Sequence, residues 1–407
     1  MKTRVILGSL ACLLLFSGAD WQQFRGGDNT GSTDSVDLPP TEFSVETASS
    51  DAKNVVWSVD LPARGVSSPI VVGDQVFVTG VSGAKQERLH VLAYAKSNGK
   101  LNWHRQFWAT GRTLCHPTSS VAAPTPASDG NCIYAFYSSN DLICLDLAGN
   151  LRWYRGLTLE NPTAANDVGM AASPLVADGV VIVQVENKGD SFATGLDAAT
   201  GESLWRAPRT ADMNWTSPAL FQPEGAKPQV LLQSTDKLTA HDVRTGEELW
   251  LYQGKCDGIS SPVSKGDLIL FAADGITALR AGAGSSNWEK VWQEAGLSTG
   301  SPSAVVHRGK VYVLNRAGVL TCGDTATGKV LWKTRAKGPY WATPLAIGDL
   351  LYLVNQDGAA HVVKTSGEKG EVLSTMEFGE SVLASPAYSD GSLYFRGERH
   401  LWRIGTP

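Results

Sequence analysis

Eight times along the chain, a Ser-Pro dipeptide or a close variant opens a short apolar run that soon meets a turn. The dipeptides are Ser68-Pro69, Thr125-Pro126, Ser173-Pro174, Ser217-Pro218, Ser261-Pro262, Ser301-Pro302, Thr343-Pro344 and Ser385-Pro386. Successive prolines of this set are 57, 48, 44, 44, 40, 42 and 42 residues apart. A period of this length, built from several short strands, is typical of a β-propeller, in which each repeat forms one four-stranded blade. The repeat therefore predicts an all-β, eight-bladed propeller of four-stranded antiparallel blades.

The third repeat shows how one blade is encoded. It runs from Ala172 to Trp205 and contains the pairs Asp178-Gly179 and Thr200-Gly201, which suit tight turns that need positive φ. β-Branched residues fill the runs between these pairs and favour strands. The ending Asp, two residues, Thr-Gly and then Trp recurs from Asp242 to Trp250 and from Asp324 to Trp332. Three turns joining four strands make one antiparallel meander.

Most repeats end in a tryptophan. These residues are Trp103, Trp153, Trp205, Trp250, Trp292 and Trp332. A Trp that recurs at one place in nearly every repeat is better explained as a contact between neighbouring blades than as a ligand platform. Each such contact would contribute at most about 4 to 6 kcal/mol through burial of the indole. The seventh repeat departs from the pattern, with Leu373-Ser374 where the Trp would fall.

The last repeat stops before its fourth strand. Residues Val55 to Val59 precede the first dipeptide and have the sequence of a closing strand, so we expect them to complete the eighth blade. Such closure removes exposed sheet edges. The expected layout is a signal peptide at 1–19, an extended N-terminal strap at 20–53, and a single propeller domain at 54–407.

The first 19 residues predict export. Lys2 and Arg4 precede an apolar stretch from Val5 to Phe16, and Ser17-Gly18-Ala19 offers a cleavage site, which is the pattern of a signal peptide and not of a membrane span. Lipidation at Cys12 is less favoured, because the usual Leu three residues before the cysteine is absent. We expect a periplasmic or extracellular protein.

Charge limits the partners that we expect. The chain has 35 Lys and Arg against 40 Asp and Glu, and removal of residues 1–19 takes away two bases, leaving a net charge of about −7. An acidic surface without basic runs argues against nucleic acid and anionic membranes as partners. We expect a monomer that does not span a membrane.

Five cysteines follow the signal peptide: Cys115, Cys132, Cys144, Cys256 and Cys322. An odd number leaves at least one thiol unpaired, and buried, unpaired side chains are the simplest interpretation for all five. A hairpin turn at Ser138 to Asp141 would place Cys132 opposite Leu147 and Cys144 opposite Ala135. No haem-attachment motif or zinc-type Cys/His cluster occurs, and no metal site is predicted.

The Asp, Thr-Gly and Trp pattern resembles the repeat of the PQQ-binding-like β-propeller family, which has the quinoprotein alcohol dehydrogenase-like fold. The opening Trp21 to Gly26 and the segment Thr125 to Gly130 resemble exported bacterial members, and the resemblance covers about residues 20 to 405. It implies fold more than function, because the family includes quinone dehydrogenases, the propeller lipoprotein of the outer-membrane β-barrel assembly machinery and uncharacterised scaffolds.

The resemblance also implies features of the true dehydrogenases. They bind pyrroloquinoline quinone (PQQ) with calcium and carry an adjacent Cys-Cys pair, which this chain lacks. Their calcium ligands and Asp base cannot be placed on this sequence. We therefore expect no cofactor, with PQQ and calcium as the alternative.

In a propeller, the loops leading into the innermost strands surround one mouth of the central channel, which is the default binding surface. The residues of these loops include Cys115, Met170, Ser298, Thr299 and Glu380. The predicted ligand-binding residues are Arg64, His116, Asn166, Asp167, Asn214, Trp215, Asp257, Tyr340 and Trp341. Two entry segments, His104 to Ala122 and Tyr154 to Ala171, are longer than the rest and suggest a lid or recognition edge.

Each candidate also has a structural interpretation. Asn and Asp before a strand commonly cap turns, and His116 before Pro117 can simply fill its loop. Trp215, Tyr340 and Trp341 can stack on a planar ligand, a sugar or a peptide, or they can plug the pore.

Catalytic motifs do not emerge from the sequence. No phosphate loop, nucleophile elbow or paired zinc histidines occur. The leading hypothesis is an exported, non-catalytic propeller that binds a protein, peptide or carbohydrate partner at the channel mouth. The alternatives are a PQQ-dependent dehydrogenase that oxidises an alcohol or sugar, and a cell-envelope assembly scaffold.

Overall fold

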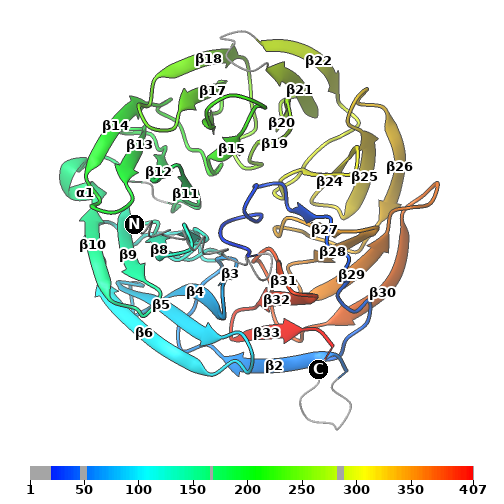
Figure 1. Cartoon of the computed structure of the whole chain (residues 1–407), viewed down its shortest axis with the longest axis horizontal. Helices are drawn as coiled ribbons and strands as arrows, with labels where there is room; N and C mark the ends of the chain where they lie inside the picture. Colours follow the sequence, from blue (N-terminus) through cyan, green and yellow to red (C-terminus); the bar gives the residue numbers. More distant parts are fainter. Residues whose placement is uncertain (1–19, 46–52, 166–167, 282–287, 407) are drawn as a thin grey trace, which may run out of the picture.

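Eight antiparallel sheets stand around a central axis and close into a ring (Figure 1). The computed structural model describes residues 20–45, 53–165, 168–281 and 288–406. Within these ranges the only helix is the single-turn α1 (Leu157–Glu160). The prediction of an all-β, eight-bladed propeller is confirmed, because seven sheets have four strands and the other has four plus the short parallel strand β1 (Ser32–Thr33).

The strands run through the blades in chain order, from the innermost to the outermost. Blade 1 consists of β3 (Ile70–Val72), β4 (Gln75–Ser82), β5 (Arg88–Ala95) and β6 (Leu101–Trp108), and blade 2 of β7 (Ala127–Ser128), β8 (Cys132–Phe136), β9 (Asp141–Asp146) and β10 (Leu151–Gly156). Blade 3 consists of β11 (Leu175–Ala177), β12 (Val180–Val185), β13 (Phe192–Asp197) and β14 (Ser203–Pro208), and blade 4 of β15 (Ala219–Phe221), β16 (Gln229–Gln233), β17 (Lys237–Asp242) and β18 (Glu248–Gln253). Blade 5 consists of β19 (Val263–Lys265), β20 (Leu268–Ala272), β21 (Ile276–Ala281) and β22 (Trp288–Glu294), and blade 6 of β23 (Val305–His307), β24 (Lys310–Leu314), β25 (Val319–Asp324) and β26 (Val330–Arg335). Blade 7 consists of β27 (Leu345–Ile347), β28 (Leu350–Val354), β29 (Ala359–Lys364) and β30 (Glu371–Glu377). Blade 8 consists of β31 (Ala387–Ser389), β32 (Ser392–Arg396) and β33 (His400–Ile404), and its outermost strand is β2 (Val55–Asp60) from the N-terminal part of the chain.

The N-terminal strand closes the ring as predicted. β2 pairs antiparallel with β33, from Val55 opposite Ile404 to Asp60 opposite His400. Strands from the two ends of the chain therefore share the eighth blade (Figure 1).

The Asp and Thr-Gly motif forms the last turn of a blade and seats the Trp of the blade before it. Asp197 Oδ1 accepts hydrogen bonds from the backbone N–H of Thr200 at 2.9 Å and from its hydroxyl at 3.1 Å. Gly201 has φ 73° and lies against the indole of Trp153, whose Nε1 donates to the carbonyl of Ala198 at 3.0 Å. The Asp, Thr-Gly and Trp motif recurs along the chain because the turn of one blade and the Trp of the blade before it form a single contact.

The same indole-to-turn hydrogen bond recurs around the ring. It joins Trp57 to Lys96 O, Trp103 to Leu147 O, Trp205 to Val243 O and Trp292 to Thr325 O. The interpretation of these residues as contacts between blades is confirmed. Trp250 differs, since its indole donates to Gln229 in its own blade.

A ring of hydroxyl groups surrounds the axis at the start of the innermost strands. Its members, which we call the hydroxyl ring, are Ser68, Thr125, Ser173, Ser217, Ser261, Ser303, Thr343 and Ser385. The backbone N–H of each of the first seven donates to the hydroxyl oxygen of the next, at 2.9 to 3.1 Å. In the sixth repeat, the predicted dipeptide Ser301-Pro302 lies two residues before the position that corresponds to the dipeptides of the other repeats. Ser303, and not Ser301, occupies the ring position. A serine stands at both positions, so the sequence could not separate them.

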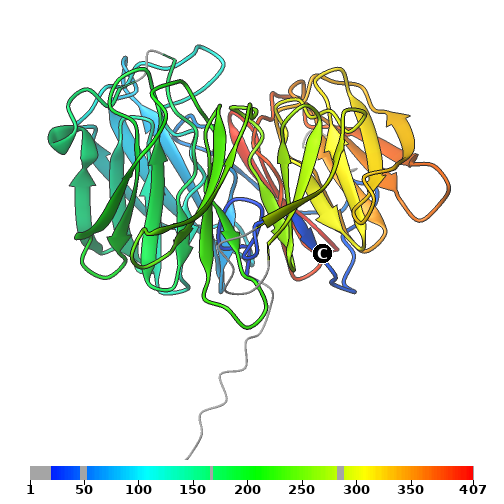
Figure 2. The same cartoon turned by 90° about the horizontal axis from the view of Figure 1, so that it is seen from above.

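The N-terminal strap, here residues 20–45, runs across the end of the channel opposite the entry loops and touches all eight blades (Figures 1 and 2). Hydrogen bonds join the strap to blades 1 to 4. The backbones of Trp21 and Val71 pair in blade 1, and in blades 2 to 4 the backbone N–H groups of Ser128, Val176 and Leu220 donate to Gln22 O, Gln23 Oε1 and Asn29 Oδ1, respectively. Hydrogen bonds also join it to blades 5 to 8. The Arg25 and Ser32 side chains donate to Pro262 O and Val306 O in blades 5 and 6, and Gly31 O and Asp37 O accept from the Ala346 N–H and the Tyr388 hydroxyl in blades 7 and 8. The strap therefore closes one end of the channel.

Three local expectations need correction. Cys132 faces Asp146 and Cys144 faces Tyr134, one residue away from the expected register, because the hairpin closes at Tyr137 and Asp141. All five described cysteines are free, as expected, but Cys115 and Cys132 are only half-buried. The entry segments are also shorter than predicted, since β6 continues to Trp108 and β10 to Gly156.

Candidate functional site

The central channel encloses a cavity of about 610 Å³. The hydroxyl ring forms its wall, and Phe24 of the strap reaches it from the closed end. His116, Trp215 and Trp341 line it on the side of the entry loops, together with apolar side chains from several blades. The structure thus brings three of the predicted site residues together at one cup-shaped cavity.

The two tryptophans are held from different blades. Trp215, which is half-buried, leads into blade 4, and its Nε1 donates to Gly169 O at 3.0 Å. Trp341 leads into blade 7, is 41% exposed, and donates to Gln356 Oε1 at 2.7 Å. The Arg316 guanidinium lies 5.4 Å from the centre of the Trp341 ring. Hydrogen bonds at both indoles fix the rings, so they present preformed aromatic surfaces to the cavity.

His116 is exposed at the mouth. Its Nδ1 lies 2.8 Å from the Thr118 hydroxyl, within the same turn. Thr118 also lines the cavity.

Three other predicted residues have structural surroundings. Asn214 is buried, and its Nδ2 donates to Thr216 Oγ1 and Gln233 O. Asp257 Oδ1 accepts from the N–H groups of Ile259 and Ser260, as a turn cap does. Tyr340 is fully buried, and burial raises the pKa of its hydroxyl. None of the three is among the residues that line the central cavity.

Asn166 and Asp167 lie outside the described residues. Glu380, from the same set of entry loops, has an almost fully buried side chain. Its carboxylate accepts from the N–H groups of Arg399 and His400 and forms an ion pair with the Arg399 side chain at 3.0 Å. Glu380 therefore holds the β32–β33 turn.

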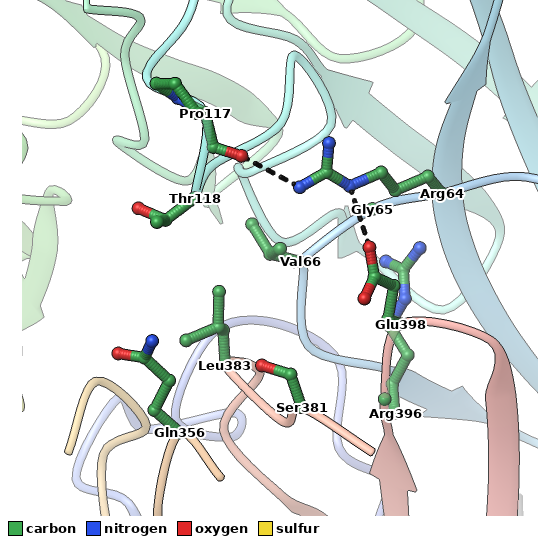
Figure 3. Close-up of a pocket in the computed structure, with 11 residues that line it drawn as sticks. Arg64, Gly65, Val66, Pro117, Thr118, Gln356, Ser381, Leu383, Arg396 and Glu398 are labelled. Atoms are coloured by element: carbon green, nitrogen blue, oxygen red, sulfur yellow. Dashed lines mark hydrogen bonds and ion pairs between the residues drawn. The ribbon is translucent and has the colours of Figure 1, made fainter. Parts of the chain in front are cut away.

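A smaller pocket of about 200 Å³ opens beside the central cavity, between blades 8 and 1 (Figure 3). It shares Val66, Thr118 and Leu383 with the central cavity, so the two spaces adjoin. The predicted residue Arg64 lies here, with its Nε 3.3 Å from Glu398 Oε1 and its Nη2 donating to Pro117 O at 3.0 Å. We call this space the side pocket.

Arg396 forms part of the side pocket and is 1% exposed. Its Nη1 donates to the carbonyl and the hydroxyl of Ser67, at 3.2 and 2.6 Å. Sequence reasoning missed Arg396, because it ends a regular inner-blade strand and carries no motif. It also missed Arg316 and the role of Phe24, which only the path of the strap reveals.

The charges around the central cavity are of one sign. Among the described lining residues there is no Asp or Glu, whereas Arg316 and His116 supply nitrogen groups. The chain as a whole has a net charge of −5. A ligand that offers hydrogen-bond acceptors or negative charge fits this lining better than a cation does.

The donor set does not fit calcium, and hence not the PQQ–calcium pair that the resemblance implies. Calcium takes six to eight oxygen ligands, with carboxylates prominent among them. The described cavity lining supplies hydroxyls but no carboxylate. In the described part of the chain, no group of three or more His, Cys, Asp or Glu residues is placed to hold a metal ion.

Across the residues with described positions, no helix has the length and apolar character needed to cross a membrane.

Comparison with known proteins agrees with this architecture. A family model described as outer membrane protein assembly factor BamB matches residues 44–168, 162–265 and 272–394. The polyvinylalcohol dehydrogenase of a Pseudomonas species is 23% identical over 244 residues, which cover 49% of this chain and 36% of that relative. The chain thus spans little more than a third of that relative's length.

Solved structures show the same fold. BamB from Moraxella catarrhalis superposes with a TM-score of 0.63 at 17% identity, covering 86% of this chain and 96% of that one. The quinohemoprotein alcohol dehydrogenase from Comamonas testosteroni gives 0.70 at 15% identity, covering 96% and 81%. At these identities the likeness concerns the fold alone.

Proposed function

The chain belongs to the PQQ-repeat propeller family whose model is described as outer membrane protein assembly factor BamB, and from that premise we propose that it is a non-catalytic propeller that binds a peptide segment of a partner protein in its central cavity. The observation that carries this proposal is the form of the cavity, which is closed at one end by the strap, lined by fixed aromatic rings and hydroxyls, and without acidic side chains among its described residues. Cavities of this size and mixed lining are suited to small ligands and to short segments of larger ones.

The hydroxyl ring is suited to peptide carbonyl groups. Seven of its oxygens already accept a backbone N–H from the neighbouring blade. Each of these hydroxyls keeps its own hydrogen for donation, and all of them line the cavity. A bound peptide would offer carbonyl oxygens as acceptors.

The apolar side chains of the lining favour a peptide over a carbohydrate. Met213, Ile259 and Leu383 line the cavity along with the tryptophans. Recognition of sugar hydroxyls would be served by planar amide or carboxylate side chains, and the described lining of the central cavity contains none. Apolar pockets with a few placed hydrogen-bonding groups are typical of peptide recognition.

Binding in the cavity is also favoured over binding along a blade edge, the arrangement expected of a scaffold. The exposed leucines of the outermost strands are spread around the perimeter, for example Leu151 in blade 2, Leu204 in blade 3 and Leu331 in blade 6. Scattered single apolar residues are ordinary for a protein surface and do not form a docking patch.

Export is part of the proposal. It rests on the signal peptide predicted at residues 1–19, which lie outside the described residues, and on the family model's description as an outer membrane protein assembly factor. We propose a location in the periplasm or outside the cell.

Equilibrium dialysis of the mature protein against a pooled tetrapeptide library, with mass spectrometry of the retained peptides, tests the proposal. We expect retained peptides whose affinity falls about tenfold or more in Trp341→Ala and Trp215→Ala, since buried aromatic contacts commonly dominate binding. Trp108→Ala is the matched control, because Trp108 is 58% exposed and does not line the cavity. Equal retention by all four proteins, or no retained peptide, would contradict the proposal.

The second candidate is a PQQ-dependent dehydrogenase, because the solved structures that share this fold include a quinohemoprotein alcohol dehydrogenase and the likeness in fold leaves the activity open. Incubation with PQQ and calcium, followed by a thermal shift and an assay of dye-linked alcohol or sugar oxidation, separates the two functions. The donor set of the cavity predicts no calcium-dependent shift, and clear turnover would replace the binding proposal.

A further inference from the structure

The Arg396 guanidinium is a buried cation with unused hydrogen-bonding groups. It extends from the end of β32 toward Gly65, beneath the Arg64 and Glu398 pair (Figure 3). Nη1 bonds to Ser67, but neither Nε nor Nη2 has a hydrogen-bond partner in the described structure. Buried charged donors normally have partners, because burying them without one costs several kcal/mol. Two free donors on one buried guanidinium therefore point to a missing acceptor.

The two free donors form a fork. Nε and Nη2 lie on the same edge of the planar guanidinium, and this edge matches the two oxygens of a carboxylate in a bidentate pair. The absence of a side chain at Gly65 leaves room for the guanidinium itself, since a Cβ atom there would lie closest to Arg396 Nη2 and 2.8 Å from Cζ. The geometry of the free edge thus specifies a planar, two-oxygen acceptor.

No group within the described structure neutralises this cation. Among the described residues, Arg396 forms no ion pair with an acid. The titratable groups that act on its pKa are the phenols of Tyr94 and Tyr137. The Tyr137 hydroxyl donates to His90 O, and the Tyr94 hydroxyl has no partner. Burial lowers the pKa of Arg396 to about 10, so the guanidinium stays charged at neutral pH.

We propose that the Arg396 side chain binds a carboxylate of the peptide held in the central cavity, which makes the side pocket a carboxylate subsite. This inference rests on the proposed function. The side pocket adjoins the cavity through Val66, Thr118 and Leu383, so a peptide in the cavity can place its C-terminal carboxylate or an acidic side chain against the free edge.

The rim of the side pocket modulates this binding. Arg64 is a second cation there, and its 3.3 Å ion pair is with Glu398, which is half-exposed. An entering carboxylate meets repulsion from Glu398 and competes with it for Arg64. Removal of the Glu398 charge should therefore strengthen the binding of a carboxylate in the side pocket and leave the binding of an uncharged peptide unchanged.

Equilibrium dialysis with three tetrapeptide libraries tests the inference and identifies the source of the carboxylate. One library has free C termini and no Asp or Glu, one is amidated and contains Glu, and one is amidated without acidic residues. We expect one of the first two to bind about tenfold or more tighter than the third, as for other hydrogen bonds to charged groups. If all three bind equally while Trp341→Ala still weakens them, the carboxylate subsite is overturned and the proposed function stands.

Variants then connect the preference to the side pocket. Glu398→Gln should tighten binding of the carboxylate-bearing library about threefold or more and leave the uncharged library unchanged, whereas Arg396→Gln should abolish the preference. Glu224→Gln, at an exposed acid outside both pockets, is the matched control. An equal response to Glu398→Gln and Glu224→Gln would contradict the subsite even if Arg396→Gln does not fold.

If no peptide binds at all, the proposed function fails, and the guanidinium is tested by itself. Crystals soaked in sodium bromide should then show an anomalous peak within hydrogen-bonding distance of Arg396 Nε and Nη2. A side pocket without bromide would overturn the anion site as well.

Discussion

A Cβ atom on Gly201 would lie 2.6 Å from the indole of Trp153, so the turn of blade 3 can meet the Trp of blade 2 only through a residue without a side chain. The same relation joins Gly149 to Trp103, Gly246 to Trp205 and Gly328 to Trp292. The repeated Thr-Gly pair therefore serves both the turn and the contact between blades.

Gly201→Ala should lower the free energy of unfolding by about 2 to 4 kcal/mol, because it adds a left-handed backbone cost of about 1 to 2 kcal/mol to a steric conflict with Trp153. Gly73→Ala is the control: its φ is 58°, but a Cβ atom there would meet nothing within 4 Å. Chemical denaturation measures both. Equal losses in the two variants would show that the contact with Trp153 contributes nothing.

Ser217→Ala should destabilise the propeller by about 1 to 3 kcal/mol, since it leaves the buried N–H of Ser173 without an acceptor. Ser217→Thr should retain most of the stability, because threonine already occupies the hydroxyl ring at positions 125 and 343. Thermal unfolding of the two variants would settle this, and a Thr variant as unstable as the Ala variant would argue against the hydroxyl as the cause.

Acidification should destabilise blade 1 through the buried His90 and its partly buried neighbour His104. His90 Nδ1 lies 2.7 Å from His104 Nε2, and burial, His104 and Arg88 together lower the pKa of His90 from 6.5 to about 4. A histidine with a lowered pKa binds its proton more readily when unfolded, so stability is present above pH 6.5 and declines as the pH falls toward 4. Between pH 7 and pH 5, denaturant midpoints should fall further in the wild type than in His90→Gln. Parallel declines would exclude this pair as the origin.

Removal of the strap should open the closed end of the channel. A chain that begins at Lys53 loses the burial of Trp21 and Phe43, worth about 3 to 6 kcal/mol, and loses Phe24 from the cavity lining. We expect a lower melting temperature and weaker retention of peptides. A truncated protein that keeps full affinity would show that the strap is not part of the binding site.

Much of the fold could be predicted from the sequence because its determinants are local and repeated. The turn Asp197 to Gly201 and the indole of Trp153 specify a blade and its contact with the neighbouring blade, and Val55 to Val59 have the sequence of a closing strand. The hydroxyl ring shows where local reasoning ends, since Ser301 and Ser303 both suit the ring position and only the hydrogen bonds to Ser261 and Thr343 identify Ser303.

The candidate site was less accessible to sequence reasoning. The rule that residues just before an inner strand lie at the channel mouth correctly placed Trp215 and Trp341 at the cavity. The same rule also selected Asn214 and Tyr340, whose side chains are buried away from the cavity. Which way a loop residue points depends on neighbouring blades. Phe24 and Arg396 are brought to the two cavities by partners far away in sequence, and no spacing pattern encodes that.

The closing strand has a consequence for biosynthesis. Synthesis produces β2 before the blade strands β3 to β32 and β33 after them, yet β2 and β33 lie side by side in one blade. A chain that lacks either strand leaves an open sheet edge on the eighth blade, and exposed edges tend to pair with other chains. Ring closure therefore also protects the protein from aggregation during folding.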